Sequence, residues 1–150
     1  MADAETPNLL ELTDLDVIWG SRPLLRDIQL KAGVQEIIGI IGPNGAGKTT
    51  LMNVIAGQLP PTRGKIIYQG QDITSWPPHR RCRQGIARTF QIPRPFAEMT
   101  AWENVAIAIR FGRPSPGDGL LRQEAIPFLE KVGMTHKADT LGRDLTLSEQ

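Results

Sequence analysis

Residues 42–49 read Gly42-Pro43-Asn44-Gly45-Ala46-Gly47-Lys48-Thr49, and this stretch decides the fold. It matches the pattern G-x-x-x-x-G-K-[ST], in which glycines let the backbone curl so that successive N–H groups point at one anion. Lys48 supplies a mobile positive charge to terminal phosphates, and the hydroxyl of Thr49 is placed to ligate Mg²⁺. The alternative is a chance glycine turn, which arises in roughly one chain of this length in a hundred or fewer. The stretch therefore predicts a phosphate loop for ATP with Mg²⁺.

The flanks of the loop have the context that this motif requires. Residues 36–41 are β-branched and apolar on both faces, which predicts a strand buried inside a parallel sheet. Leu51, Val54 and Ile55 then recur at helical spacing and predict a helix after the loop. Further upstream, period-two alternation predicts strands over residues 10–19, with a phase shift between residues 12 and 15, and over residues 28–30.

Downstream of the helix the character of the chain changes. A strand is expected at residues 65–68, a short basic helix at residues 79–83 and a further strand at residues 86–91. Thr100 and Glu103 form a capping box that opens a helix. A Gly/Pro-rich loop at residues 112–119 leads to another helix ending near residue 132, which Pro127 should kink or begin. The chain is therefore expected to divide into residues 1–91 and a helical part, residues 92–150.

Composition limits the remaining possibilities. The 150 residues are 40% hydrophobic with a net charge of +1, so no strong field draws the chain to nucleic acid. A single cysteine, Cys82, excludes an internal disulfide and is interpreted as a reduced thiol. No stretch approaches the ~20 apolar residues that cross a bilayer, and the acidic, polar first residues are unlike a secretory signal. A cytoplasmic protein, able to attach to a membrane protein, is expected.

The loop, extended to Thr50, is typical of ATP-binding-cassette ATPases, and the resemblance continues along the whole chain. It implies an α/β fold: a P-loop ATPase core with an antiparallel β subdomain and an α-helical subdomain, truncated before Walker B. Trp19 stands where the family places an aromatic ring against adenine; the alternative is a core tryptophan closing a strand. The resemblance implies the following nucleotide-binding residues: Trp19, Gly42, Asn44, Gly45, Ala46, Gly47, Lys48, Thr49 and Thr50.

The segment Gly85-Ile86-Ala87-Arg88-Thr89-Phe90-Gln91 resembles the family's Q-loop. The resemblance implies that Gln91 reaches Mg²⁺ and the attacking water, and that Lys48 and Gln91 serve catalysis. Taken alone, Gln91 is only a polar residue at a strand end. Residues 85–105 are similar to the ATPase subunits of branched-chain amino-acid importers and to their urea- and amide-importer relatives. Permease subunits would then dock near residues 92–103, on the inner face of the plasma membrane, and a second ATPase subunit would bind head to tail.

The resemblance is incomplete at the signature motif, Leu-Ser-Gly-Gly-Gln. The best match is Leu145-Thr146-Leu147-Ser148-Glu149, in which both glycines are replaced. Thr146 and Ser148 would face the ATP of the partner subunit. The Walker B strand and the switch histidine are expected later, because His79 and His136 lie in the wrong places and should face solvent. We therefore expect an N-terminal fragment that binds nucleotide weakly, does not hydrolyse it and self-associates through uncovered sheet surface.

Two other functions stay open at this point. One is a cassette ATPase outside transport, acting in translation or repair, against which the near-neutral charge and the Q-loop segment weigh. The other is a nucleotide-binding module without catalysis. A GTPase is disfavoured, because the sequence lacks the Asn-Lys-x-Asp motif that reads guanine.

Overall fold

Alternating apolar and polar residues build a four-stranded sheet in the first half of the chain. The computed structural model describes residues 8–112 and 121–149. All paired strands are antiparallel, in the order β2-β1-β3-β4. The strands expected at residues 10–19, 28–30 and 65–68 are confirmed. Their bounds are Leu10–Trp19 (β1), Arg22–Ala32 (β2), Arg63–Tyr68 (β3) and Gln71–Asp72 (β4).

The phase shift in β1 is a bulge. Between Leu12 and Leu15, β1 has one residue more than both of its neighbours, and Asp14 takes a φ of 49°. On β2, Asp27 takes a φ of 46°, and an extra β2 residue restores the β1–β2 pairing before Leu25. Because a bulge moves one residue out of the pleat, Leu12 and Leu15 both face the core although three positions separate them.

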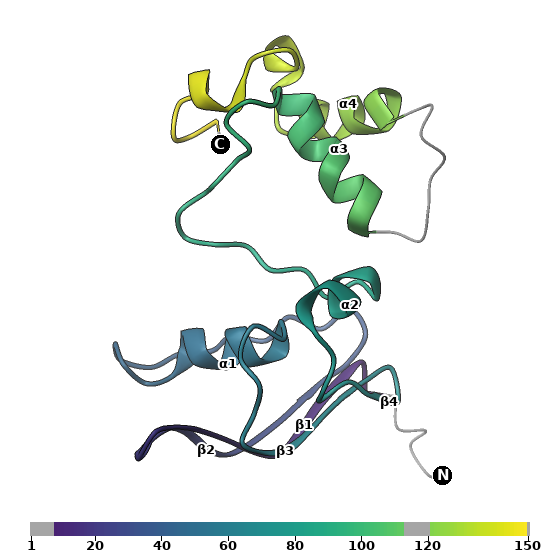
Figure 1. Cartoon of the computed structure of the whole chain (residues 1–150). Helices are drawn as coiled ribbons and strands as arrows, with labels where there is room; N and C mark the ends of the chain where they lie inside the picture. The colour runs from purple at the N-terminus through teal and green to yellow at the C-terminus, as the bar shows by residue number, and fades with distance from the viewer. Residues whose placement is uncertain (1–7, 113–120, 150) are drawn as a thin grey trace. The chain divides into compact units, whose positions relative to one another are not determined.

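The phosphate-loop helix packs on the sheet. Helix α1, Lys48–Ile55, lies over it (Figure 1) and buries Leu51 and Val54. The expected basic helix is confirmed as α2, Pro78–Arg83, which follows β4. Both histidines, His79 and His136, are exposed, as expected. The apolar side chains buried in this part of the chain are Leu12, Leu15, Val17, Leu25, Leu51, Val54, Ile66, Ile73 and Trp76.

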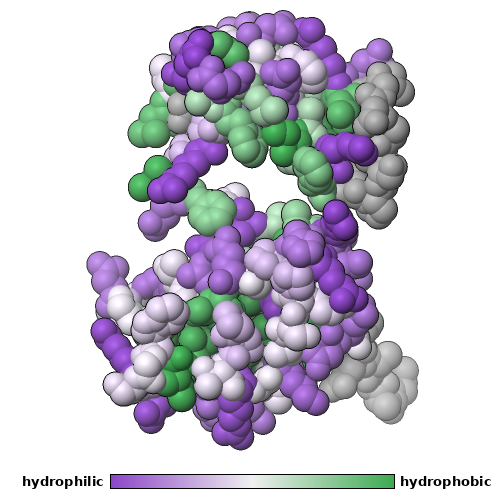
Figure 2. Space-filling model, in the orientation of Figure 1, coloured by the Kyte–Doolittle hydropathy of each residue, from purple (hydrophilic) through white to green (hydrophobic). Residues whose placement is uncertain are grey.

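Two expected strands are wrong. Residues 36–41 and 86–91 form neither helix nor strand, and Ile37 and Ile41 are each 97% exposed. Apolar side chains reach the surface of both halves of the chain in Figure 2. The physical reason is that a strand exists only with a partner for its N–H and C=O groups. The four described strands pair among themselves, and none pairs with residues 36–41.

The second half of the chain is helical. Helix α3, Ala101–Gly112, and helix α4, Leu121–Lys131, pack together and are followed by short 3₁₀ turns at Thr135–Lys137 (η1) and Gly142–Asp144 (η2). Pro127 lies inside α4, so it does not mark the helix start. The capping box is confirmed: the Thr100 N–H donates to Glu103 Oε2 at 2.7 Å. The loop expected at residues 112–119 lies outside the described residues apart from Gly112. The buried core of this half is Ala101, Ala106, Ile109, Ala125, Leu129, Ala138 and Leu145.

The chain forms two compact units that divide between Arg81 and Cys82. The functional division expected at residue 92 stays a prediction. Among the described residues, no helix combines the length and the apolar character that a membrane crossing needs.

Candidate functional site

The phosphate loop is shaped by two glycines with left-handed backbone. Gly45 has φ 84° and Gly47 has φ 91°, a region that other residues rarely adopt. Gly47 is also packed tightly, because a Cβ there would lie 2.6 Å from Leu25 Cδ2 and 3.0 Å from the carbonyl oxygen of Leu24. At Gly45 the same Cβ would meet nothing within 4 Å. The loop therefore contacts β2 closely at Gly47. At Gly45 the glycine is needed only for the left-handed backbone conformation.

Lys48 begins α1 and folds its side chain back over the loop. Its ammonium donates to the carbonyl oxygens of Gly42 at 2.6 Å and Pro43 at 2.8 Å. The N–H of Ala46 closes the turn onto Pro43 at 3.2 Å. The positive charge is thus held beside the first turn of α1, whose N–H groups and dipole favour an anion. The loop and the helix together have the charge and the N–H donors that suit a phosphate, and phosphate binding there stays a prediction.

The remaining predicted loop residues flank this turn. Asn44 is exposed in the turn, Thr49 is exposed in the first turn of α1, and Thr50 is half-buried beside it. The Thr49 hydroxyl suits Mg²⁺, because this ion prefers oxygen and usually binds through few protein groups plus substrate phosphates. In the part of the chain that the structure describes, no cluster of three or more His, Cys, Asp or Glu side chains offers an alternative metal site. The hydroxyl oxygen of Thr49 is therefore a suitable ligand for Mg²⁺.

Trp19 closes β1 and is 70% exposed. It pairs with Arg22 across the hairpin that joins β1 to β2. The alternative of a core tryptophan is wrong, because a residue with 70% of its surface exposed is not part of the core. A flat, exposed ring at a strand end can stack on a base, and its contact with adenine stays a prediction.

Gln91 lies in the second unit, exposed and outside any helix or strand. Its predicted position at the end of a strand is wrong, because residues 86–91 do not pair. Its role toward Mg²⁺ and water stays a prediction. Downstream, the segment that it precedes is firmly held: Asn104 Nδ2 donates to the carbonyls of Phe96, Met99 and Thr100 at 3.0–3.2 Å.

The residues that match the signature motif form a self-contained turn. Glu149 Oε2 accepts both the N–H and the hydroxyl of Thr146 at 2.9 Å, and the hydroxyls of Thr146 and Ser148 lie 3.2 Å apart. These hydrogen bonds, with Lys137 at 3.4 Å from the carboxylate, lower the pKa of Glu149. Thr146 and Ser148 are both exposed. Their contact with a partner's ATP stays a prediction.

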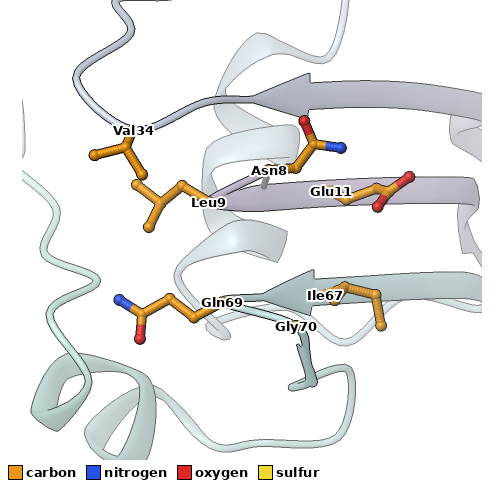
Figure 3. Close-up of a pocket in the computed structure, with 7 residues that line it drawn as sticks. All are labelled: Asn8, Leu9, Glu11, Val34, Ile67, Gln69 and Gly70. Carbon is orange, nitrogen blue, oxygen red and sulfur yellow. The ribbon is translucent and has the colours of Figure 1, made fainter. Parts of the chain in front are cut away.

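A separate pocket of about 450 Å³ lies on the sheet (Figure 3). Leu9 and Val34 lie side by side at one end of it, and Glu11 projects from β1. Glu11 pairs with Lys31 at 3.4 Å. None of the predicted nucleotide-binding residues lines this pocket, so it does not belong to the phosphate site. Its lining is Asn8, Leu9, Glu11, Val34, Ile67, Gln69 and Gly70.

Sequence reasoning missed one residue beside the phosphate-loop helix. Arg81 is 1% exposed, although its neighbours Arg80 and Arg83 are exposed. Arg80 stacks instead on Trp76, with its guanidinium carbon 3.7 Å from the ring centre. The helical spacing of a six-residue basic helix does not show which arginine faces inward. The only signal was the run of arginines next to a proline pair, which predicts a helix but no burial.

The chain is similar to known ATP-binding proteins of membrane transporters. Residues 25–149 match the family model described as ABC transporter. The lipopolysaccharide export system ATP-binding protein LptB of Acidithiobacillus ferridurans is 34% identical over 95% of this chain and 58% of its own length. The branched-chain amino acid transport protein BraF of Pseudomonas aeruginosa is 41% identical over 67% of this chain and 39% of its length. LivG of Escherichia coli K12, a high-affinity branched-chain amino acid transport ATP-binding protein, is 33% identical over 95% and 61%.

Solved structures agree with these relatives. A nucleotide-free ATP-binding cassette from an ABC transporter superposes with a TM-score of 0.77 at 30% identity, over 93% of this chain and 60% of that one. An ATP-binding cassette in its ADP conformation gives 0.78 at the same identity, over 94% and 60%. The chain spans between 39% and 61% of the lengths of these relatives and structures. The fold expected from the sequence, a cassette ATPase core with an antiparallel β part and a helical part, is confirmed.

Proposed function

This chain belongs to the ABC transporter family, and from that membership we propose that it is the ATP-binding part of a subunit that energises a membrane transporter. The loop at residues 42–49 carries the proposal. Its glycine curl, its lysine and the start of α1 converge on one turn of backbone, and together they offer several N–H donors and a positive charge to a phosphate chain.

The residues of this turn, together with Trp19, bind different parts of Mg²⁺-ATP. Backbone N–H groups of residues 45–49 hold the phosphate oxygens, and Lys48 exchanges its carbonyl contacts for the terminal phosphates. Trp19 stacks on the base. The Thr49 hydroxyl holds Mg²⁺, which neutralises charge on the phosphates when bound. Hydrolysis in the complete subunit rests on positioning and charge stabilisation, for which we propose Lys48 and Gln91 as contributors.

The first test is ATP binding by the chain itself. We expect Lys48→Ala to weaken binding of a fluorescent ATP analogue, with Mg²⁺ present, by about tenfold or more, because a charge-assisted contact is lost. Lys65→Ala, which removes an exposed lysine charge from β3, is the control for charge and should bind normally. Equal binding by the Lys48 variant and the unmodified chain would refute the phosphate-loop assignment.

For the transported solute we propose a branched-chain amino acid or a related small molecule. The names of BraF and LivG and the sequence of residues 85–105 support this choice. The likeness to LptB over 95% of the chain favours a second candidate, lipopolysaccharide export. Deleting the gene in its own host separates the two: uptake of labelled leucine should fall, whereas lipopolysaccharide delivery to the outer membrane should not. The reverse result would select the second candidate.

We also propose the partners that such a subunit needs. Permease subunits dock near residues 92–103, where Ile92 is 67% and Phe96 is 56% exposed. A second ATPase subunit binds head to tail, with Thr146 and Ser148 facing its ATP. The complex sits at the cytoplasmic face of the plasma membrane. The net charge of +1 supports the absence of a nucleic-acid partner.

A further inference from the structure

Arg81 is a buried cation, and among the described residues its hydrogen-bond acceptors are four backbone carbonyls. Its Nε donates to the carbonyl of Trp76 at 3.0 Å, and one terminal nitrogen donates to Thr74 at 2.9 Å. The other donates to Val54 at 2.8 Å and Ile55 at 2.9 Å. Burial lowers the pKa of the guanidinium, yet an arginine keeps its proton in a protein. A full positive charge therefore stands at 1% exposure among four carbonyl oxygens.

Two of those carbonyls belong to the last turn of the phosphate-loop helix. Val54 and Ile55 end α1, where the carbonyls carry the negative end of the helix dipole, and the Val54 carbonyl also accepts the N–H of Gly57 at 3.0 Å. A cation is favourable there. The other two carbonyls, Thr74 and Trp76, lie in the segment between β4 and α2. The planar guanidinium thus joins the end of α1 to that segment, which the single nitrogen of a lysine could not do as completely.

Gly57 shows that the chain makes room for this guanidinium. It has φ 79°, and a Cβ there would lie 2.9 Å from Arg81 Nε and 3.1 Å from the Trp76 carbonyl oxygen. The backbone leaving α1 therefore fits closely around Arg81. At the other end of the same helix, Gly47 is seated against Leu24 and Leu25. Helix α1 is held at both ends by contacts that leave little space.

We propose that Arg81 is a positioning residue for phosphate binding. It fixes the C-terminal end of α1, and a helix of eight residues is a rigid rod of about 12 Å that transmits this position to Lys48 and Thr49. The N–H groups of the first turn then meet the phosphates without rearrangement, which is the advantage of a preorganised site. The inference rests on the proposed function, because it assigns Arg81 a role in the same ATP site.

The test compares ATP affinity with stability. Arg81→Met removes all four hydrogen bonds. Arg81→Lys keeps the positive charge but loses the planar guanidinium group that bonds several carbonyls at once. Arg83→Met, in the same helix but exposed, is the matched control for charge. Ile66→Val, a buried change on β3, is the control for a loss of thermal stability. Affinity of the full chain for ATP and ADP with Mg²⁺ is measured well below every melting temperature.

We expect Arg81→Met to raise the Kd for ATP roughly tenfold, in the range found for residues that orient a binding group. Arg81→Lys should fall between this variant and the unmodified chain, and the loss should be larger for ATP than for ADP, which offers fewer phosphates to the turn. Both controls should bind normally. If Arg81→Met does not fold, the Arg81→Lys result decides.

Normal ATP binding by Arg81→Lys and Arg81→Met would overturn the inference and leave the proposed function intact. So would an equal loss of affinity in Ile66→Val at matched stability, because the effect would then be general. An unmodified chain that does not bind ATP would refute the proposed function, and the inference would fall with it.

Discussion

At the scale of single residues, the backbone shape of the phosphate loop depends on two glycine positions where a side chain would be unfavourable. Gly45 and Gly47 share a left-handed backbone, but only Gly47 backs onto another strand. The sequence pattern fixes Gly47 but leaves the position of Gly45 open. The structure separates two reasons, conformation at Gly45 and conformation plus contact at Gly47.

Gly47→Ala should therefore destabilise the chain more than Gly45→Ala. Left-handed backbone alone costs a non-glycine residue ~1–2 kcal/mol. At Gly47 the new methyl also overlaps Leu25 Cδ2 and the Leu24 carbonyl, and we expect a further loss of about 1–3 kcal/mol from overpacking. Denaturant unfolding of the two variants measures the difference. Equal losses of unfolding free energy in the two variants would show that β2 accommodates the added methyl group at no energetic cost.

At the scale of elements, the sequence was most informative where structure is local. The capping box at Thr100 and Glu103 involves neighbours in sequence and was predicted from a few residues. The alternation in β1 also showed the phase shift between Leu12 and Leu15, but not its cause, a bulge against the neighbouring strands. The strands expected at residues 36–41 and 86–91 failed, because pairing needs a distant partner that no local pattern reveals. The inward turn of Arg81 was missed for the same reason, since its acceptors lie up to 27 residues away.

The capping box makes a pH prediction for the helical unit. Hydrogen bonds from the Thr100 N–H and hydroxyl lower the pKa of Glu103. A carboxyl whose pKa is lower when folded stabilises the fold at pH values above its unfolded pKa, about 4.3. That stabilisation disappears as the pH falls through the folded pKa. Melting temperatures between pH 7 and pH 2 should therefore fall less for Glu103→Gln, which can still cap the helix without titrating.

Glu98→Gln is the control for that comparison, because Glu98 is an exposed carboxylate of the same unit that caps no helix. If the melting temperatures of Glu103→Gln and the unmodified chain fell in parallel as the pH is lowered, the capping carboxylate would not be a source of acid sensitivity.

At the scale of the whole molecule, the surface holds apolar side chains that a lone chain would normally bury. Ile37 and Ile41 are each 97% exposed, on a segment whose residue types suit a buried strand. This segment offers a specific site for the expected self-association, because an unpaired apolar segment can pair with another copy of the chain.

Replacing both isoleucines by lysine should reduce that self-association. Charges on an unpaired edge block strand addition, and exposed positions contribute little to folding, within about 0.5 kcal/mol. Light scattering over a concentration series measures the first effect, and thermal unfolding checks the second. Lys substitutions at the exposed residues Gln58 and Gln71, which add the same charge elsewhere, are the control. A doubly substituted chain that associates as strongly as the original would place the contact elsewhere.

The offset bulges of β1 and β2 constrain how the lengths of these strands can change during evolution. Asp14 adds a residue to β1, and an extra β2 residue near Asp27 cancels the resulting slip at the pair Val17 and Leu25, before a further irregularity between Val17 and Ile18. Losing one residue alone would shift every later pair by one position. Losing both would leave β1 and β2 in step, although β1 would still shift by one position against β3. Insertions and deletions in this hairpin are therefore coupled, and homologous sequences should gain or lose the two residues together.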